Sequence, residues 1–263
     1  AIGEATFDLT GLSGTSYTIT VTKNNYQPYS GLVNVTSSGA ILSVDGPNLV
    51  LDDHFGNDDG NLNPGETVVL SIPVMNNGTE DLYEISATLT ASSELVTITS
   101  ATVEYGTVNI GETSSSDFGI TLSPAAVQSE DLGLRLLITD NSSNEWEAEV
   151  HIDVIGSLLA VNGNGYLEPG ETTSFNINLI NLGQQAENAI FAELSYNGSQ
   201  IQIEDGYGTW SELSPGETGI SQNSFEITVI HDIVNGTILP LNLHIQSDDG
   251  YDRMEILNVQ IGE

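Results

Sequence analysis

The feature that most constrains this chain is an internal repeat. Asp59-Gly-Asn-Leu-Asn-Pro-Gly-Glu-Thr67 aligns with Asn164-Gly-Tyr-Leu-Glu-Pro-Gly-Glu-Thr172, so the motif glutamates Glu66 and Glu171 lie 105 residues apart. The same offset aligns Asn76-Asn-Gly78 with Asn181-Leu-Gly183, Ala87-Thr-Leu89 with Ala192-Glu-Leu194, and Gly111-Glu-Thr113 with Gly216-Glu-Thr218. Tyr105-Gly-Thr107 aligns with Tyr207-Gly-Thr209 at an offset of 102, which predicts a small insertion or deletion. Ordered matches of this kind indicate two homologous modules.

Strand signals dominate both modules. Apolar and polar residues alternate in short runs such as Tyr17–Thr22, Thr67–Val74 and Ser174–Ile180. A side-chain period of two predicts half-buried strands, and we expect Ser174–Ile180 to form one of them. About seven short strands in roughly 105 residues is typical of an immunoglobulin-like sandwich. The sequence therefore predicts an all-β chain of tandem immunoglobulin-like β-sandwiches, with one module in residues 47–156 and the second in residues 157–263.

Residues 1–46 differ from both modules. They offer about three strand signals, at Glu4–Leu9, Tyr17–Lys23 and Leu32–Thr36. Three strands bury little apolar surface, so the segment is not expected to be stable alone. We expect it to be a partial immunoglobulin-like β segment that ends a preceding sandwich, or else to pack on the first module.

The charge balance excludes several classes of function. The chain of 263 residues has 3 Lys and Arg against 37 Asp and Glu, a formal net charge of −34. Nucleic-acid binding needs clustered basic residues, and so does docking on anionic lipid. No apolar run reaches the length of a membrane span, so no membrane insertion is expected. Charge repulsion of this size favours bound cations or counterions.

Oxygen donors crowd the loop between residues 52 and 66. Side-chain carboxylates and amides on a glycine-containing turn are the hard ligands that Ca²⁺ takes, six to eight at a time. The loop is no EF-hand, because its glycine and glutamate do not fit that spacing. The alternative is a turn whose Asp and Asn side chains cap their own backbone. The predicted Ca²⁺ ligands of the first module are Asp52, Asp53, Asn57, Asp59, Asn61 and Glu66.

The second copy of this loop has fewer charged donors. Ser157 and Leu158 stand where the first copy has Asp52 and Asp53. Affinity for Ca²⁺ follows the number of charged ligands, so binding here is expected to be weaker or absent. The candidate ligands of the second module are Asn162, Asn164, Glu168 and Glu171.

Signals for catalysis are poor. The chain has no cysteine and no Gly-x-Ser-x-Gly motif. Its four histidines are His54, His151, His231 and His244, and they form no paired metal-binding spacing. We therefore expect no catalytic residues within this chain. Trp146 and Trp210 are expected to pack in the core or at an edge rather than to form a ligand platform.

Two stretches resemble modules of large secreted proteins. Tyr17-Thr-Ile-Thr-Val-Thr-Lys-Asn-Asn-Tyr-Gln-Pro-Tyr-Ser-Gly31 resembles the end of the immunoglobulin-like domain that follows the catalytic domain of gingipain-type (C25) cysteine peptidases. The loop from Asp53 to Glu66, with the Asn-x-Gly after its strand, resembles modules appended to secreted proteins of Bacteroidetes-related bacteria. The resemblance implies an extracellular or cell-surface protein with an upstream catalytic domain. The catalytic cysteine of that family has no counterpart here.

The function expected from these features is a non-catalytic, calcium-stabilised accessory, stalk or adhesion region. Its partner would be the upstream catalytic domain, or a protein or glycan surface ligand. Three alternatives remain open: a carbohydrate-binding module with Tyr26, Tyr29, Trp146 and Trp210 as aromatic candidates, the processed C-terminal part of a cysteine peptidase, and a subunit of a surface filament assembled by strand exchange.

Overall fold

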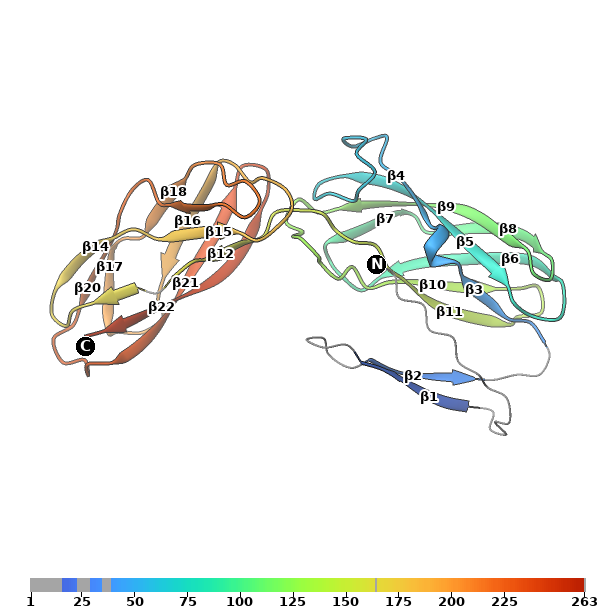
Figure 1. Ribbon diagram of the computed structural model, residues 1–263, viewed down its shortest axis with the longest axis horizontal. Helices are drawn as coiled ribbons and strands as arrows, with labels where there is room; N and C mark the ends of the chain where they lie inside the picture. The colour runs from blue at the N-terminus through green and yellow to red at the C-terminus, as the bar shows by residue number, and fades with distance from the viewer. Residues whose placement is uncertain (1–15, 23–28, 35–38, 164, 263) are drawn as a thin grey trace.

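A computed structural model describes residues 16–22, 29–34, 39–163 and 165–262. These residues form strands throughout, and their one helical element is the short 3-10 turn η1 (Gly46–Asn48). Several sheets lie face to face in two groups along the long axis of the molecule (Figure 1), and their strands pair antiparallel except for the parallel pair β13 (Gly165–Leu167) and β22 (Asp252–Ile261). The all-β class is confirmed, and the paired sheets are consistent with a β-sandwich class. The tandem immunoglobulin-like assignment stays a prediction.

The N-terminal part contributes one hairpin. Strands β1 (Ser16–Val21) and β2 (Tyr29–Asn34) pair antiparallel, with Ser16 opposite Asn34. Figure 1 draws this hairpin below the first group of sheets. The expected strand Glu4–Leu9 lies outside the described residues.

The first group contains two sheets around one hydrophobic core. One sheet has the order β3-β5-β9-β7, with β4 also paired to β5, and the other has the order β11-β10-β6-β8. Phe118, Ile72 and Leu136 are fully buried between the two sheets. The strands are β3 (Leu42–Val44), β4 (Val50–Asp52), β5 (Thr67–Asn76), β6 (Leu82–Ala91), β7 (Val96–Ser100), β8 (Thr102–Val108), β9 (Thr113–Leu122), β10 (Leu134–Thr139) and β11 (Glu145–Val150).

The second group repeats this plan with more interruptions. Its largest sheet has the order β13-β22-β21-β16-β18, and it faces two three-stranded sheets, β12-β15-β19 and β14-β20-β17. Phe225, Leu243 and Ile227 are fully buried in its core. The strands are β12 (Leu159–Val161), β13 (Gly165–Leu167), β14 (Thr172–Phe175), β15 (Asn178–Asn181), β16 (Ile190–Ser195), β17 (Ile201–Asp205), β18 (Tyr207–Trp210), β19 (Thr218–Ile220), β20 (Phe225–Val229), β21 (Thr237–Ser247) and β22 (Asp252–Ile261).

The prediction of a single strand over Ser174–Ile180 is wrong. The chain changes partner inside this run, because β14 pairs with β20 whereas β15 pairs with β19. Asn176 lies at the break, and its side-chain amide donates to the backbone oxygen of Ser221 at 2.8 Å. The alternation of exposed and buried side chains continues through the break, with Ile177 and Leu179 buried. The two-residue alternation of buried and exposed side chains therefore continues even where the hydrogen-bonded pairing of strands is interrupted.

The repeated Asn-x-Gly block is a buried backbone clamp in both groups. Asn76 Nδ2 donates to the backbone oxygens of Glu80 and Val108 at 2.8 and 2.9 Å, and its Oδ1 accepts from Gly78 N. Both copies bury the asparagine completely. Because a buried amide that loses its partners is costly, this clamp fixes the loop between the two sheets.

The second clamp uses the same atoms 105 residues later. Asn181 Nδ2 donates to the backbone oxygens of Gln185 and Leu213 at 2.7 and 2.9 Å, and its Oδ1 accepts from Gly183 N. A Cβ on Gly183 would lie 2.3 Å from the backbone oxygen of Gly156, so only glycine fits there. The two clamps establish the repeat as a structural one over these residues.

The expected alignment of Tyr105 with Tyr207 is wrong. Tyr105 donates its hydroxyl to the backbone oxygen of Ile72 at 2.8 Å, and Trp210 donates its indole N–H to the backbone oxygen of Ile177 at 3.1 Å. Both pairs are related by 105 residues, so Trp210 is the counterpart of Tyr105 and no insertion is needed between them. Trp210 is buried in the core, as expected.

Candidate functional site: the loop between residues 52 and 66

The loop ends in a tight turn directly before β5. Glu66 N donates to the backbone oxygen of Asn63 at 3.2 Å across Pro64 and Gly65. Gly65 has a φ of 86°, the left-handed conformation that the second central position of a type II turn requires. Gly170 has a φ of 79° at the same place in the second copy. The repeated Pro-Gly pair therefore serves the turn, independently of any ligand.

Asp53 organises the middle of the loop. Its side chain is buried at 3% exposure, and its Oδ2 accepts from the backbone N–H groups of Asp59 and Gly60 at 2.8 and 3.0 Å. Gly60 has a φ of 79° and Asp58 a φ of 59°, so the loop reverses direction sharply beside this carboxylate. A buried carboxylate held by two N–H donors stabilises that reversal.

The side chains of Asn57, Asp59, Asn63 and Glu66 meet on the other side of the loop. Asn57 Nδ2 lies 3.2 Å from Asp59 Oδ2 and 3.1 Å from Asn63 Oδ1. Glu66 accepts from the backbone N–H groups of Asn57 and Asn63 through its two carboxylate oxygens, at 2.9 and 3.1 Å. Oxygens from three side chains thus surround one asparagine.

The two remaining predicted ligands of the first module lie toward the solvent. Asp52 Oδ1 accepts from the backbone N–H of His54 at 3.0 Å. Asn61 donates its backbone N–H to Asp59 Oδ1 at 2.8 Å. Asp52 and Asn61 are exposed, and among the described residues their side chains bond only within the loop. The arrangement is that of side chains capping their own backbone, the alternative considered for this sequence.

Asn63 was missing from the predicted ligand set, yet it connects the loop to the rest of the molecule. Its side chain is 3% exposed, and its Nδ2 donates to the backbone oxygen of Ile155 at 2.8 Å. Ile155 N in turn donates to the backbone oxygen of Leu62 at 2.9 Å. The loop is therefore fastened to the segment that joins the two groups of sheets. The Asn-Pro-Gly-Glu motif gave a sequence signal for the turn, but none for this distant contact.

The second copy of the loop makes different contacts. Asn162 donates its Nδ2 to Thr218 Oγ1 at 3.2 Å, and Glu168 accepts from the hydroxyl of Tyr166 at 2.8 Å. Glu171 donates its backbone N–H to Glu168 O, within the Pro-Gly turn. Asn164 lies outside the described residues. The alignment of Ser157 and Leu158 with Asp52 and Asp53 is wrong, because Leu159 pairs with Asn181 as Leu42 pairs with Asn76. Leu158 therefore lies at the place of Ile41 and packs against the second core, and Asp53 has no counterpart among the described residues of the second group.

The donor set around the first loop has the chemistry that Ca²⁺ prefers, since carboxylate and amide oxygens predominate. Among the described residues, however, no three His, Cys, Asp or Glu side chains converge as a metal-binding group. The oxygens of Asp53 and Glu66 are held by backbone N–H groups. Binding of Ca²⁺ there would require some of these hydrogen bonds to be exchanged for metal contacts.

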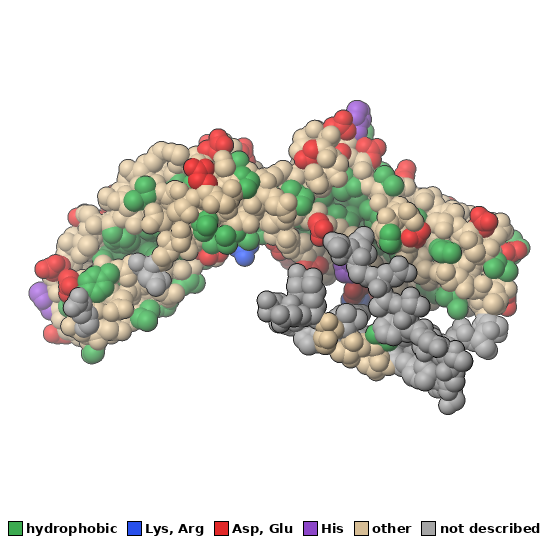
Figure 2. Space-filling view, in the orientation of Figure 1, with side chains coloured by type: hydrophobic (Ala, Val, Ile, Leu, Met, Phe, Trp, Pro, Cys, Tyr) green, Lys and Arg blue, Asp and Glu red, His purple; other side chains and the backbone are tan. Residues whose placement is uncertain are grey.

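Acidic side chains cover both groups of sheets. Figure 2 shows Asp and Glu at many places on the visible face, whereas the blue of Arg occupies only small spots among the described residues. Within the part of the chain that the structure describes, no helix is long and apolar enough to cross a membrane.

No protein-family model matches the chain, and no curated protein matches it either. Among solved structures, a Porphyromonas gingivalis W83 protein of unknown function is 13% identical with a TM-score of 0.28, over 83% of this chain and 99% of that one. A red sea bream transglutaminase is 11% identical with a TM-score of 0.38, over 88% of this chain and 32% of that one. The native Escherichia coli alpha-2-macroglobulin is 9% identical with a TM-score of 0.30, over 89% and 18%. TM-scores this low assign neither a common fold nor a function, and the resemblance to gingipain-type peptidases stays a prediction.

Proposed function

We propose that this chain is a non-catalytic accessory or stalk region of a secreted or cell-surface bacterial protein, built from tandem immunoglobulin-like sandwiches and stabilised by Ca²⁺ at the loop between residues 52 and 66. In this proposal the region lies downstream of a gingipain-like peptidase domain. It holds its neighbours at a fixed distance and performs no reaction itself.

The observation that carries the stalk role is the fastening of the junction between the two groups of sheets. On one side, Asn63 holds the backbone at Ile155. On the other, Gln128 donates its backbone N–H to Ser157 O at 3.1 Å and accepts from Gly156 N through its side chain at 3.0 Å. Val127 from the same segment is buried in the core of the second group. A linker held from both sides favours a fixed spacing over free rotation.

Small-angle X-ray scattering of the whole chain tests this role. We expect an extended particle whose distance distribution has two separated maxima, one within and one between the sandwiches. Asn63→Ala should broaden the second maximum, because it removes the bond to Ile155. Asn61→Ala, which changes a residue bonded only within the loop, is the matched control. A compact globule for the native chain would contradict the proposal.

Two features support Ca²⁺ at the first loop. Asp59, Asn63 and Glu66 supply oxygens around Asn57, and the chain carries a net charge of −34 that bound cations would relieve. Titration with Ca²⁺ followed by calorimetry tests it, with Asp59→Asn as the ligand variant and Glu168→Gln in the second copy as the control. No heat and no change in melting temperature on adding Ca²⁺ or chelator would remove the metal from the proposal. The DNA sequence upstream of residue 1 tests the peptidase domain directly.

A further inference from the structure

The largest sheet of the second group, β13-β22-β21-β16-β18, turns one face to the core and the other outward. Its outward side chains form rows across the strands. Met254, His244, Glu193 and Tyr207 make one row, and Asp252, Gln246, Phe191 and Thr209 make the next. We call this surface the β21–β22 face.

Large apolar side chains are exposed along the β21–β22 face. Ile238, Ile256 and Met254 are 61%, 48% and 53% exposed. Pro240 is also exposed, and it lies diagonally across from Ile256 because its direct partner is Asn258. The exposed apolar side chains therefore form a diagonal strip across β21 and β22. Tyr207 is exposed at the far strand and stacks on Phe191, with ring centroids 6.3 Å apart.

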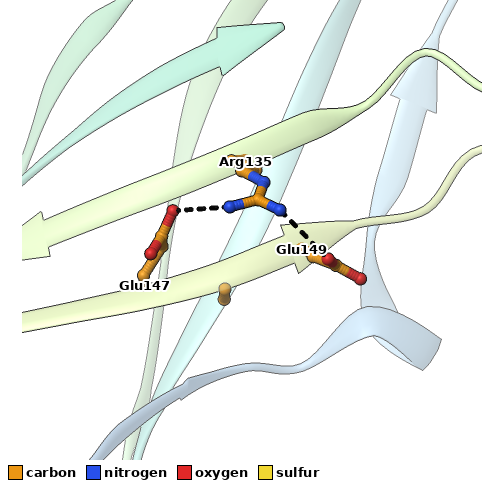
Figure 3. A pocket seen from close by; sticks show the side chains of 4 residues that line it. Arg135, Glu147 and Glu149 are labelled. Atoms are coloured by element: carbon orange, nitrogen blue, oxygen red, sulfur yellow. Dashed lines mark hydrogen bonds and ion pairs between the residues drawn. The ribbon is translucent and has the colours of Figure 1, made fainter. Parts of the chain in front are cut away.

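The first group provides an internal control for this surface. Its sheet β11-β10-β6-β8 has the same register, so Glu147 and Glu149 occupy the places of Met254 and Ile256, and Arg135 occupies that of Asn242. Figure 3 shows Arg135 between these two glutamates, at 3.1 Å from Glu147 and 3.6 Å from Glu149. An exposed ion-pair cluster in one copy is thus an apolar strip in the other.

The aromatic pair is also specific to the second copy. Ser86 and Thr102 stand in the first sheet where Phe191 and Tyr207 stand in the second. Loss of charge together with gain of Tyr, Phe and Met is the compositional mark of a protein–protein interface core. Since the scaffold is otherwise repeated, the difference is not required by the fold.

We infer that the β21–β22 face is the contact surface of a homodimer of this chain. The charges favour a second copy over a basic partner. The corresponding face of the first group carries four carboxylates, those of Glu104, Glu145, Glu147 and Glu149. The β21–β22 face keeps only Glu193 and Asp252, and Asp252 is bonded to His244 at 2.7 Å. A basic partner would gain from carboxylates on this face, whereas an acidic partner requires their removal, and a second copy of this chain is such a partner.

The size of the surface fits this occupant. Strands β21 and β22 are 11 and 10 residues long. The five strands of the sheet hold 34 residues, which at about 3.4 Å per residue and 4.8 Å between strands cover about 550 Å². That is on the scale of the ~800 Å² that each partner buries in a standard interface. Two such sheets pack face to face in the way that sheets pack within a sandwich.

Sedimentation equilibrium of the whole chain over a range of concentrations tests this inference. We expect a monomer–dimer equilibrium that shifts toward dimer as NaCl is raised, because salt screens the repulsion between two chains of net charge −34. The double variant Met254→Glu/Ile256→Glu copies the first sheet, and it should raise the dimer dissociation constant about a hundredfold or more, since it buries unpaired carboxylates.

A matched control adds the same charge elsewhere. Thr88→Glu/Thr90→Glu on the outer face of β6 should leave the dissociation constant within a few-fold of the native value, and circular dichroism establishes that both double variants remain folded. The chain has no native cysteine, so Asn242→Cys with a short bis-maleimide should cross-link copies, while Arg135→Cys should not. A native chain that stays monomeric at high salt, or a dimer that survives Met254→Glu/Ile256→Glu, would overturn the inference. Neither result bears on Ca²⁺ or on the stalk role.

Discussion

The two groups of sheets share the buried side chains that hydrogen-bond to the backbone, and they differ in the side chains that face solvent. Asn76 and Asn181 make the same three hydrogen bonds, and Tyr105 and Trp210 donate to corresponding carbonyls. By contrast, Glu147 and Glu149 on the outer face of the first group are replaced by Met254 and Ile256 in the second. A duplicated β-fold is thus maintained by a few buried polar residues, which leaves its loops and outer faces free to diverge.

The largest expected effect comes from the shared clamp. Asn181→Ala removes the hydrogen bonds that its amide donates to Gln185 O and Leu213 O and those that it accepts from Gly183 N and Leu158 N. We therefore expect a loss of about 2–4 kcal/mol in the free energy of unfolding. Asn76→Ala should cost a similar amount in the first group. Trp210 and Trp146 report the two groups separately, through denaturant titrations followed by fluorescence of single-tryptophan variants. Unequal losses would show that the clamps are not equivalent.

Removing the carboxylate of Asp53, which has no counterpart among the described residues of the second group, is expected to give the next largest effect. Asp53→Leu removes two charge-assisted bonds to Asp59 N and Gly60 N, at a cost of about 2 kcal/mol. In the second group, Leu158→Asp should also destabilise the chain, because Leu158 packs on the second core. Thermal unfolding measures both. If Asp53→Leu were neutral, the loop would be held by other contacts.

Val127 tests how separate the two groups are. It precedes the junction in sequence but is buried in the second core, so Val127→Ala should cost about 1–2 kcal/mol there. We expect the loss in the transition reported by Trp210, with little change in that of Trp146. Val50→Ala, at an exposed site, is the control and should have no measurable effect. A loss of stability confined to the Trp146 transition would show that Val127 packs in the first core, contrary to the structure.

Tyr251 links stability to alkaline pH. Burial raises its pKa to about 12, while its hydroxyl bonds to both backbone groups of Leu159. Because the folded pKa exceeds the unfolded value of about 10, its contribution is complete below pH 10 and is lost as pH rises toward 12. Tyr251→Phe should cost about 1 kcal/mol at neutral pH and flatten the decline of stability above pH 10. An unchanged alkaline profile would exclude this residue as its source.

The smallest effect is expected on the outer face of the first sheet. Arg135 and its two glutamates are all at least half exposed, so Arg135→Ala should change stability by less than about 1 kcal/mol. Raising the salt concentration should reduce the difference further. A larger loss, measured by denaturant titration, would indicate that the alkyl part of Arg135 also packs on the sheet.

Sequence reasoning found the repeat and the all-β class, because spaced glycines and two-residue alternation are local signals. It failed at Ser174–Ile180, since alternation reports which side is buried and not which strand is the partner. It aligned Tyr105 with Tyr207 by identity, whereas the fold uses Trp210, a different residue with a donor at the same place.

The loop shows a similar limit. Its crowd of donors was evident from the sequence, and so was the alternative that they cap backbone. The importance of Asn63 depends on Ile155, 92 residues away, and no local pattern encodes such a contact. The apolar strip on β21 and β22 was also missed, because alternation hides Met254 and Ile256 among polar neighbours.

The crossing of Val127 into the second core has a practical consequence for anyone preparing single sandwiches. A cut at the linker near Gly156 would remove Val127 from the second core and leave a cavity there. The same cut would leave the side chain of Val127 exposed to water on the fragment that contains the first group of sheets. Expression of the second half alone should therefore give a weaker product than its strand count suggests, unless the excised segment is supplied as a peptide.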